Sequence, residues 1–158
     1  QNLIHLDIKP SNILIDDKFH PLLNDFFLLT KYKPDEENAL IGGTPLYMAP
    51  EVRRSSDYDT SVDIYSFAIT MVEVIEGKLE FSEPKNKILQ NITEGERPLI
   101  NTQIKKPIRD LIDRCWSADP FERLTAEQLF EKLAYDPEYY LEGVNAEEVI
   151  SYADSIKQ

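Results

Sequence analysis

A polar stretch near the start of the chain carries side chains that could act together on a phosphate. The segment His5-Leu6-Asp7-Ile8-Lys9-Pro10-Ser11-Asn12 holds a carboxylate, an ammonium group and a carboxamide within one short span. The Asp7 carboxylate can accept a proton, and the Lys9 ammonium can neutralise a phosphate. The amide oxygen of Asn12 can ligate a hard cation. This stretch is therefore the first candidate site.

Two short apolar runs flank this stretch and must position it. Leu3-Ile4 precedes it, Ile13-Leu14-Ile15 follows it, and both runs are typical of short strands. The layout predicts a loop of chemical groups that a small buried ribbon pins at both ends. An ordinary polar turn in a hairpin is the simpler interpretation, but the motifs that follow along the chain favour the first one.

The polar stretch resembles the catalytic loop of eukaryotic protein kinases, H-R-D-x-K-P-x-N, with Leu6 in place of the arginine. The resemblance implies that Asp7 accepts or orients the proton of a substrate hydroxyl, while Lys9 neutralises the transferring phosphate. It also implies that Asn12 binds one Mg²⁺ ion and that His5 supports the shape of the loop.

A second motif follows a predicted hairpin. Residues 13–23 predict the hairpin, which leads into Asn24-Asp25-Phe26-Phe27. In the resemblance this is the D-F-G position, so Asp25 would hold the Mg²⁺ that bridges the ATP phosphates. Phe27 stands where the family has glycine, and a bulky residue resists backbone conformations that glycine tolerates. We therefore expect Phe27 to restrict the flipping of this segment, and it could displace Asp25.

A third motif, Gly43-Thr44-Pro45-Leu46-Tyr47-Met48-Ala49-Pro50-Glu51, resembles the kinase segment G-T-x-x-Y-M-A-P-E. In that family the segment receives the substrate residue beside the phosphoacceptor. Thr44 and Tyr47 are therefore candidate substrate-binding residues. Thr44 paired with Lys9 resembles the serine/threonine-specific pattern, and residues 28–43 would form the activation loop.

A long apolar segment predicts the helix that would hold the first motif. Thr60 or Ser61 can cap its start, Gly77 ends it, and apolar residues occur nearly all round it. The segment resembles the central helix of the kinase large lobe, which implies that Asp63 bonds the backbone of the loop from His5 to Asn12. A favourable interaction of Asp63 with the helix dipole alone is the alternative.

A late motif, Cys115-Trp116-Ser117-Ala118-Asp119-Pro120-Phe121-Glu122-Arg123-Leu124-Thr125, resembles C-W-x-x-D-P-x-x-R-P-T, with Leu124 in place of the proline. This form is similar to the tyrosine-kinase-like group of serine/threonine kinases. The resemblance implies a buried ion pair between Arg123 and Glu51. Cys115 lies in an apolar helical pattern, which indicates a core side chain in preference to a nucleophile.

Hydrophobic spacing predicts three amphipathic helices after the central one. Their inward-facing residues are Ile88, Leu89 and Ile92 in the segment 84–93; Ile108, Leu111, Ile112, Cys115 and Trp116 in the next; and Leu129, Phe130 and Leu133 in a helix that Thr125 caps and that runs to about Leu133. The predicted fold class is therefore mainly α: a partial protein-kinase-like large lobe, with a short β-ribbon that carries the catalytic and metal-binding loops.

The resemblance covers about Leu3 to Ala134, so we predict a partial kinase domain over residues 1–134. Residues 135–158 lie outside it and are acidic. Within them, residues 145–156 could form a helix through Val149, Ile150, Tyr152 and Ile156. The tail would then be a connector or accessory helix towards an additional domain. A disordered tail is the other possibility.

Charge and composition exclude several classes of function. The net charge of −12 argues against non-specific binding to nucleic acid or anionic membranes. No run of about 18 apolar residues predicts a membrane segment. The single cysteine excludes an internal disulfide and suits a reducing compartment, so we expect a cytoplasmic protein.

These motifs predict a protein serine/threonine kinase that transfers the γ-phosphate of ATP to a protein hydroxyl, with ATP and Mg²⁺ as cofactors. A pseudokinase, which keeps the fold as an interaction module without turnover, is the alternative that Leu6 and Phe27 favour. The intact candidate catalytic and metal-binding residues argue against it. A third hypothesis is an unrelated hydrolase that uses His5 and the carboxylates and cleaves its substrate without ATP.

The sequence lacks the motifs of the kinase small lobe. It has no Gly-rich phosphate loop, no V-A-I-K-like lysine with its partner glutamate, and no helix before the catalytic loop. Gln1 in place of methionine favours a partial sequence of a longer kinase over a truncated product. We therefore expect a missing small lobe in the full-length chain, a protein substrate, and no activity from residues 1–158 alone.

Phosphorylation of the activation loop should change activity little. Leu6 offers neither charge nor a hydrogen-bond donor where the family has an arginine that pairs with the loop phosphate. The acidic run Asp35-Glu36-Glu37 would also repel a phosphate on Thr30, Tyr32 or Thr44. The test is phosphatase treatment of the full-length enzyme followed by measurement of kcat/KM. A fall of more than about tenfold, traced to a loop site, would contradict this prediction.

Overall fold

The computed structural model describes residues 3–32, 42–54, 58–82 and 87–157 of the 158-residue chain. In chain order its elements are β1 (Leu3–Ile4), the 3-10 turn η1 (Pro10–Asn12), β2 (Ile13–Ile15), β3 (Pro21–Leu23), η2 (Phe26–Leu28), β4 (Thr30–Lys31), α1 (Pro50–Arg54), α2 (Ser61–Glu76), α3 (Ile88–Thr93), α4 (Lys106–Cys115), η3 (Pro120–Glu122), α5 (Ala126–Tyr135), η4 (Pro137–Tyr139) and α6 (Ala146–Ile156). The described part is therefore mainly helical, with small two-stranded sheets, as the sequence predicts.

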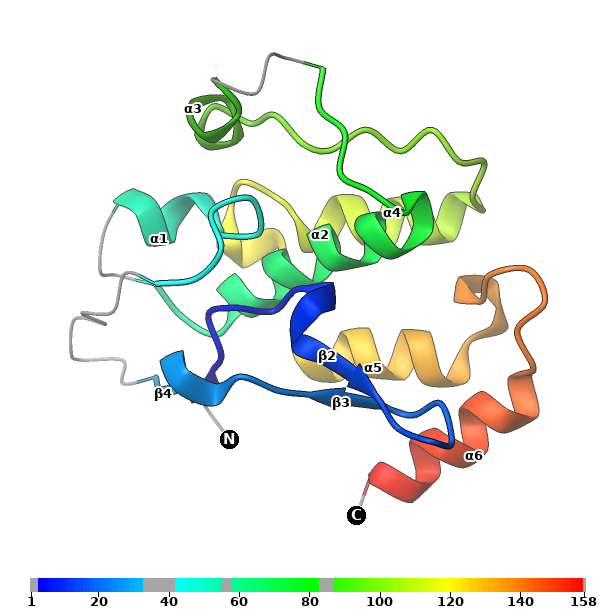
Figure 1. Ribbon diagram of the computed structural model, residues 1–158. Coiled ribbons are helices and arrows are strands. Elements are labelled where there is room, and N and C mark those ends of the chain that lie inside the picture. Colours follow the sequence, from blue (N-terminus) through cyan, green and yellow to red (C-terminus); the bar gives the residue numbers. More distant parts are fainter. Residues whose placement is uncertain (1–2, 33–41, 55–57, 83–86, 158) are drawn as a thin grey trace.

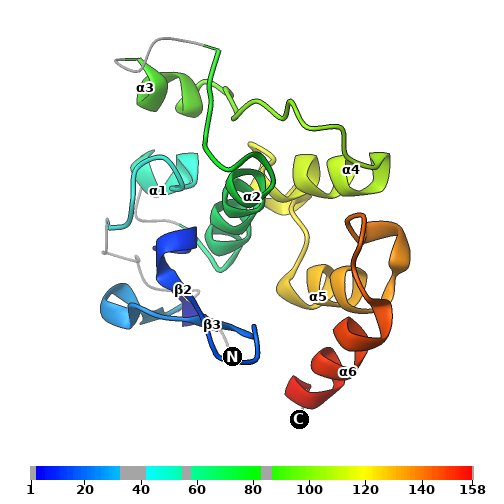
Figure 2. The ribbon, with the colours of Figure 1, turned by 45° about the vertical axis from the view of Figure 1, so that its right-hand side comes forward.

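Helix α2 lies at the centre of the molecule (Figure 1). In two views α1 and α3 lie on one side of it and α5 and α6 on the other, while α4 packs against it (Figure 2). Side chains around most of its circumference are buried, among them Val62, Tyr65 and Ile69. The predicted burial of this helix is confirmed. The loops that carry the candidate site residues form hydrogen bonds with α2.

The start of α2 differs from the prediction. Thr60 already has helical backbone angles (φ −62°, ψ −15°), and neither Thr60 nor Ser61 caps the helix with its side chain. A capping residue normally has an extended backbone that turns its side chain towards the first free N–H groups. Asp59 supplies this acceptor instead, because its Oδ1 takes a hydrogen bond of 2.8 Å from the Ser61 N–H. The helix ends at Gly77 as predicted, with φ 74°.

The strands form two separate sheets, not one buried ribbon. β1 pairs antiparallel with β4, so Leu3 lies opposite Lys31, while β2 and β3 form a hairpin with Leu14 opposite Leu22. The prediction that a buried ribbon pins the polar stretch is wrong in this respect, because the side chains of the hairpin are largely exposed. Phe19, within the predicted hairpin, lies in its turn with φ 63°.

The later helices follow the predicted stripes, with one exception in α3. The stripe of α4 is buried, and Thr125 forms a capping box with Gln128 at the start of α5. Residues 83–86 lie outside the described residues, and in α3 Leu89 is 44% exposed although it was predicted to face inward. The buried face of this short helix is narrow. It takes in Ile88 and Ile92, which lie four residues apart on the same face, and leaves Leu89 outside it.

Residues 145–156, predicted to form either a helix or part of a disordered tail, contain α6. Asn145 begins it, because its side chain accepts a hydrogen bond from the Glu147 N–H. Ala153 is its buried residue and Ile156, expected to face inward, is 53% exposed.

Cys115 is fully buried, and burial raises the pKa of its thiol to about 11. This confirms the prediction of a core side chain. None of the helices in the described ranges is both long and apolar enough to cross a membrane.

Candidate active site

The polar stretch is held on α2 by one carboxylate. Asp63 Oδ2 accepts a hydrogen bond of 2.6 Å from the His5 N–H, and Asp63 Oδ1 accepts one of 2.9 Å from the Leu6 N–H. Burial raises the pKa of Asp63, and these two hydrogen bonds oppose that rise because they favour the charged form. The loop is thereby fixed at the first turn of the central helix.

The Asp7 carboxylate lies at the centre of the candidate site and receives four hydrogen bonds. Its Oδ2 accepts from Lys9 Nζ at 2.7 Å and from Asn12 Nδ2 at 2.9 Å. Its Oδ1 accepts from the Thr44 N–H at 2.8 Å and from Thr44 Oγ1 at 2.7 Å. Three residues predicted separately as catalytic, metal-binding and substrate-binding therefore meet at one side chain.

The protonation of Asp7 follows from these contacts. Burial alone would raise the pKa of Asp7, since the group is only 8% exposed. The hydrogen bonds from Lys9, Thr44 and Asn12, together with the charge of Lys9, outweigh burial and hold that pKa below its ordinary value. Asp7 is therefore an anion at neutral pH, in the form that can accept a proton.

His5 connects the polar stretch to the second motif. Its Nε2 lies 3.0 Å from the Asn24 carbonyl oxygen, and its Nδ1 lies 3.3 Å from the Asp7 backbone nitrogen. A carbonyl oxygen can only accept, so Nε2 carries the proton and Nδ1 accepts from the Asp7 N–H. The ring also meets Phe26 edge-on at 5.4 Å between centroids. One imidazole thus ties together the residues on either side of Asp25.

The two predicted metal ligands differ in how firmly they are held. Asn12 is buried and donates both amide hydrogens, to the carbonyl oxygen and the carboxylate of Asp7. Those bonds fix the orientation of the amide group and therefore of its Oδ1, the atom that would ligate a cation. Asp25 is exposed and has a left-handed backbone (φ 63°). The Asn24 N–H donates to the Asn12 carbonyl at 2.9 Å, which holds the two segments side by side.

These two oxygen donors fit a hard cation. Within the described ranges, no group of three or more His, Cys, Asp or Glu side chains could hold a metal ion. A Mg²⁺ ion that is shared with a nucleotide does not need one, because it is commonly bound by one or two protein oxygens plus phosphates and water. The donor set therefore suits a shared Mg²⁺ and not a closed metal site.

The two departures from the kinase pattern have different structural outcomes. Phe27 lies in the 3-10 turn η2 without a positive φ, and its ring is 92% exposed. The expected backbone strain is therefore found at Asp25 and not at Phe27. Leu6 has φ 67° and is buried in the core. A side-chain carbon at Gly43 would lie 2.2 Å from the Leu6 carbonyl oxygen, so only glycine fits there.

Sequence reasoning missed several residues that fix the third motif. The Tyr47 hydroxyl donates to the Glu73 carboxylate, and burial together with that contact raises the pKa of Tyr47. Ser66 Oγ donates to the Tyr47 carbonyl at 2.8 Å. The available signal was the pair of small polar residues Ser66 and Thr70, four positions apart and both buried in the central helix. Both lie on the face of α2 that meets the loops.

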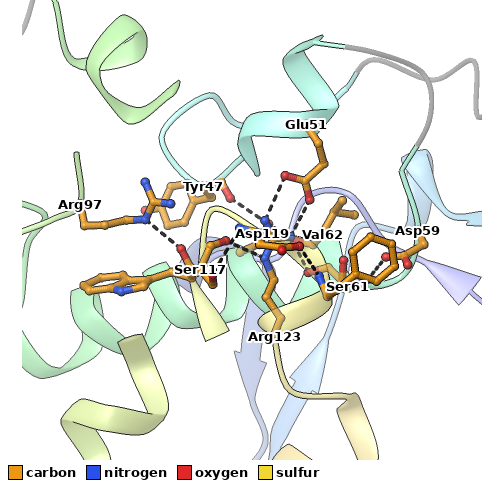
Figure 3. Close-up of polar contacts among 12 residues, drawn as sticks. Tyr47, Glu51, Asp59, Ser61, Val62, Arg97, Ser117, Asp119 and Arg123 are labelled. Atoms are coloured by element: carbon orange, nitrogen blue, oxygen red, sulfur yellow. Dashed lines mark hydrogen bonds and ion pairs between the residues drawn. The ribbon is translucent and has the colours of Figure 1, made fainter. Parts of the chain in front are cut away.

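A buried ion pair joins the end of the third motif to the late motif. Arg123 binds Glu51 through both nitrogens of its fork, with Nη1–Oε1 at 2.5 Å and Nη2–Oε2 at 3.0 Å (Figure 3). The Arg123 side chain has no exposed surface, and it also donates to the carbonyls of Ser61 and Ser117. This is the pair that the sequence predicts.

The Arg123 guanidinium also lies over the ring of Tyr65, 5.1 Å from its centroid, and Arg97 lies over the same ring at 5.0 Å. Arg97 was not expected from the sequence. It bonds the Trp116 carbonyl at 2.9 Å, so the two arginines join α2 to the segment after α4.

Comparison with known proteins gives a consistent result. A family profile described as the protein kinase domain matches residues 1–133. A dual specificity protein kinase, shkB, of Dictyostelium discoideum is 35% identical over 150 residues, which are 85% of this chain and 22% of the relative. Serine/threonine-protein kinase 12 of Arabidopsis thaliana is 35% identical over 137 residues, or 83% and 30%.

A third relative, serine/threonine-protein kinase fray2 of Dictyostelium discoideum, is 34% identical over 155 residues, which are 90% of this chain and 15% of the relative. The chain therefore spans less than a third of the length of each of these relatives.

Loss of the Glu51 charge should destabilise the fold strongly. Glu51→Gln leaves the Arg123 guanidinium buried without a carboxylate, and breaking a buried pair in this way costs on the order of 3 kcal/mol. Urea unfolding measures the change. Glu131→Gln is the matched control, because Glu131 pairs with Lys157 on the exposed surface and its loss should change the stability much less. Equal losses for the two variants would contradict this prediction.

Proposed function

The chain belongs to the protein kinase domain family, and on that premise we propose that it is the large lobe of a serine/threonine kinase. The proposed reaction transfers the γ-phosphate of ATP to a hydroxyl of a protein substrate. The observation that supports it most directly is the buried, ionised Asp7 with Lys9 and Thr44 on its carboxylate. This reaction agrees with the names of those relatives that are called serine/threonine kinases. It also agrees with the resemblance to the tyrosine-kinase-like group.

In this proposal Asp7 accepts or orients the proton of the incoming hydroxyl. Its low pKa makes it a weak base, so its main contribution is orientation of the nucleophile. Lys9 neutralises the charge of the transferring phosphate, because its ammonium group lies 2.7 Å from Asp7 Oδ2 and therefore beside the reacting oxygen. Thr44 and Tyr47 position the substrate. Catalysis is then mostly positioning and electrostatics.

Asn12 and Asp25 are the proposed ligands of Mg²⁺. When bound, Mg²⁺-ATP supplies the phosphoryl group and the charge that neutralises its oxygens. The exposed carboxylate of Asp25 and the Oδ1 of Asn12 suit that task, because both are hard oxygen donors. His5 keeps the two segments aligned through Asn24, and Asp63 fixes the loop from below.

An apolar cleft supports the assignment as a large lobe that needs further chain. It has a volume of about 820 Å³ and lies beside α2, with a lining that includes Leu3, Ile64, Phe67, Leu129, Phe130 and Tyr152. Residues 1–134 are proposed as the partial kinase domain. In the full-length protein, a helix that leads into β1 would cover this cleft, and the small lobe would cover the exposed hairpin β2–β3.

A pseudokinase remains the second candidate function. The observations that favour it are the buried Leu6, which leaves no charged group before Asp7, and the exposed ring of Phe27 beside Asp25. A pseudokinase would bind partners through the same fold without turnover. The measurement below separates the two candidates.

Replacing Asp7 should abolish phosphoryl transfer. Asp7→Asn keeps an oxygen acceptor for Lys9 or Thr44 but removes the charge that orients the hydroxyl, so the loss should fall on kcat. The measurement is transfer of radiolabelled phosphate from ATP by the full-length protein. Mg²⁺-ATP binding and folding should stay close to those of the unmodified protein. Unchanged turnover would remove Asp7 from the mechanism, and an unmodified protein that binds a partner but transfers no phosphate would favour the pseudokinase.

Residues 1–158 alone should not phosphorylate any substrate. The stretch lacks a small-lobe lysine and a cover for the phosphates, and its apolar cleft is open. We expect no ATP-dependent transfer above that of the Asp7→Asn variant of the same stretch. Poor solubility and binding of an apolar dye should accompany this result. Phosphorylation by the purified stretch, absent from the Asp7→Asn preparation, would overturn the proposal of a missing lobe.

A further inference from the structure

Helix α6 lies outside the residues that match the family profile and yet reaches the hairpin β2–β3. Both ribbon views place the turn of the hairpin beside α6 (Figures 1 and 2). The His20 ring, at the end of that turn, stacks on the Tyr152 ring of α6 with centroids 4.4 Å apart and planes 11° from parallel. The tail thus contacts the element that connects the two proposed metal ligands.

Among the described residues, polar contacts with α5 hold α6 and Lys157, the residue that follows it. The Tyr135 hydroxyl donates to Asp154 Oδ1 at 2.8 Å, and Lys157 Nζ donates to Glu131 Oε1 at 2.8 Å. Lys157 also lies 4.9 Å from the centroid of the Tyr135 ring. These contacts orient α6 on α5 and direct Tyr152 towards the hairpin. Among the ring contacts and polar contacts of the described residues, the stack with His20 is the one that links α6 to the hairpin.

Within the part of the chain that the structure describes, the side chains of the hairpin are largely exposed. Each of its strands has three residues. A two-stranded hairpin of this kind is marginally stable by itself in water. His20 is well placed to transmit an outside contact, because its backbone N–H donates to Asp16 Oδ1 at 2.8 Å and its Nδ1 lies 3.3 Å from Asp16 Oδ2. The ring therefore moves with the turn.

The position of this hairpin sets the distance between the proposed metal ligands. Asn12 immediately precedes β2, and Asp25 follows β3 after one residue. The hydrogen bond from the Asn24 N–H to the Asn12 carbonyl closes the open end of the hairpin, and the stack on Tyr152 holds the turn. We propose that Tyr152 is a positioning residue, which acts through His20 to keep the hairpin, and with it Asn12 and Asp25, in the arrangement that binds the metal.

This role differs from general support of the fold. The apolar cleft separates α6 from α2, and Ala153 is the only buried residue that α6 contributes. Removal of the Tyr152 ring should therefore leave the core around α2 intact and release the hairpin locally. The metal part of the inference rests on the proposed function, whereas the motion of the hairpin can be measured without any metal.

Hydrogen exchange of the full-length protein tests the contact. In Tyr152→Ala the amides of residues 13–23 should exchange about 3- to 10-fold faster, in line with the loss of one aromatic pair. Those of α2 should be unchanged. Tyr152→Phe keeps the ring and should behave as the unmodified protein. His20→Ala should reproduce the effect, and adding Tyr152→Ala to it should change nothing further. Unchanged exchange in the hairpin, or equal acceleration in α2, would overturn the proposal.

Binding of Mn²⁺, as a spectroscopic substitute for Mg²⁺, tests the consequence for the site. Tyr152→Ala should weaken Mn²⁺ binding in the presence of ATP by about 3- to 10-fold, and Tyr152→Phe should not. A loosened hairpin with unchanged Mn²⁺ affinity would refute the positioning role. Failure of the unmodified protein to bind Mn²⁺ would count against the proposed metal site, and the exchange measurement would still decide whether Tyr152 holds the hairpin.

Discussion

The hydrogen bonds from two consecutive backbone N–H groups to Asp63 are the constraint on which the candidate site depends. They tie His5 and Leu6 to the first turn of α2. Leu6 has a left-handed backbone at this point, which a non-glycine residue adopts only where its surroundings impose it. The energy for that conformation comes from the buried core around α2. The fold thus holds a strained turn immediately before Asp7.

The same helix also fixes the third motif and the late motif. Ser66 holds the backbone at Tyr47, and Glu73 holds its hydroxyl. The buried pair of Arg123 and Glu51 fixes the end of the third motif at the start of α2. Each of these loops is therefore held by α2 as well as by its contacts with the other loops. Such an arrangement keeps catalytic groups in register, because their supports lie on one rigid element.

Two of these anchors could be predicted from the sequence through its resemblance to the kinase family. The resemblance implies the contact of Asp63 with the loop and the pair of Arg123 with Glu51, because the motifs that carry these residues are recognisable without coordinates. Strand pairing was not predictable in the same way, since the two-residue strand at Leu3 carries too little pattern to specify its partner at Lys31. Polar contacts inside a helix, such as Ser66, depend on which loop lies against that face. The roles of the site residues in turnover stay predictions.

The Asp7 carboxylate already accepts as many hydrogen bonds as its two oxygens can usually accept. A carboxylate offers about four lone-pair positions, and those of Asp7 are taken by Lys9, by Asn12, and by the backbone and hydroxyl of Thr44. The Thr44 hydroxyl is a resident alcohol at the place where a substrate alcohol would have to bind. Engagement of a serine or threonine would therefore be an exchange of one hydroxyl for another. The hydroxyl of an incoming serine or threonine would have to compete with the Thr44 hydroxyl for the hydrogen bond to Asp7 Oδ1.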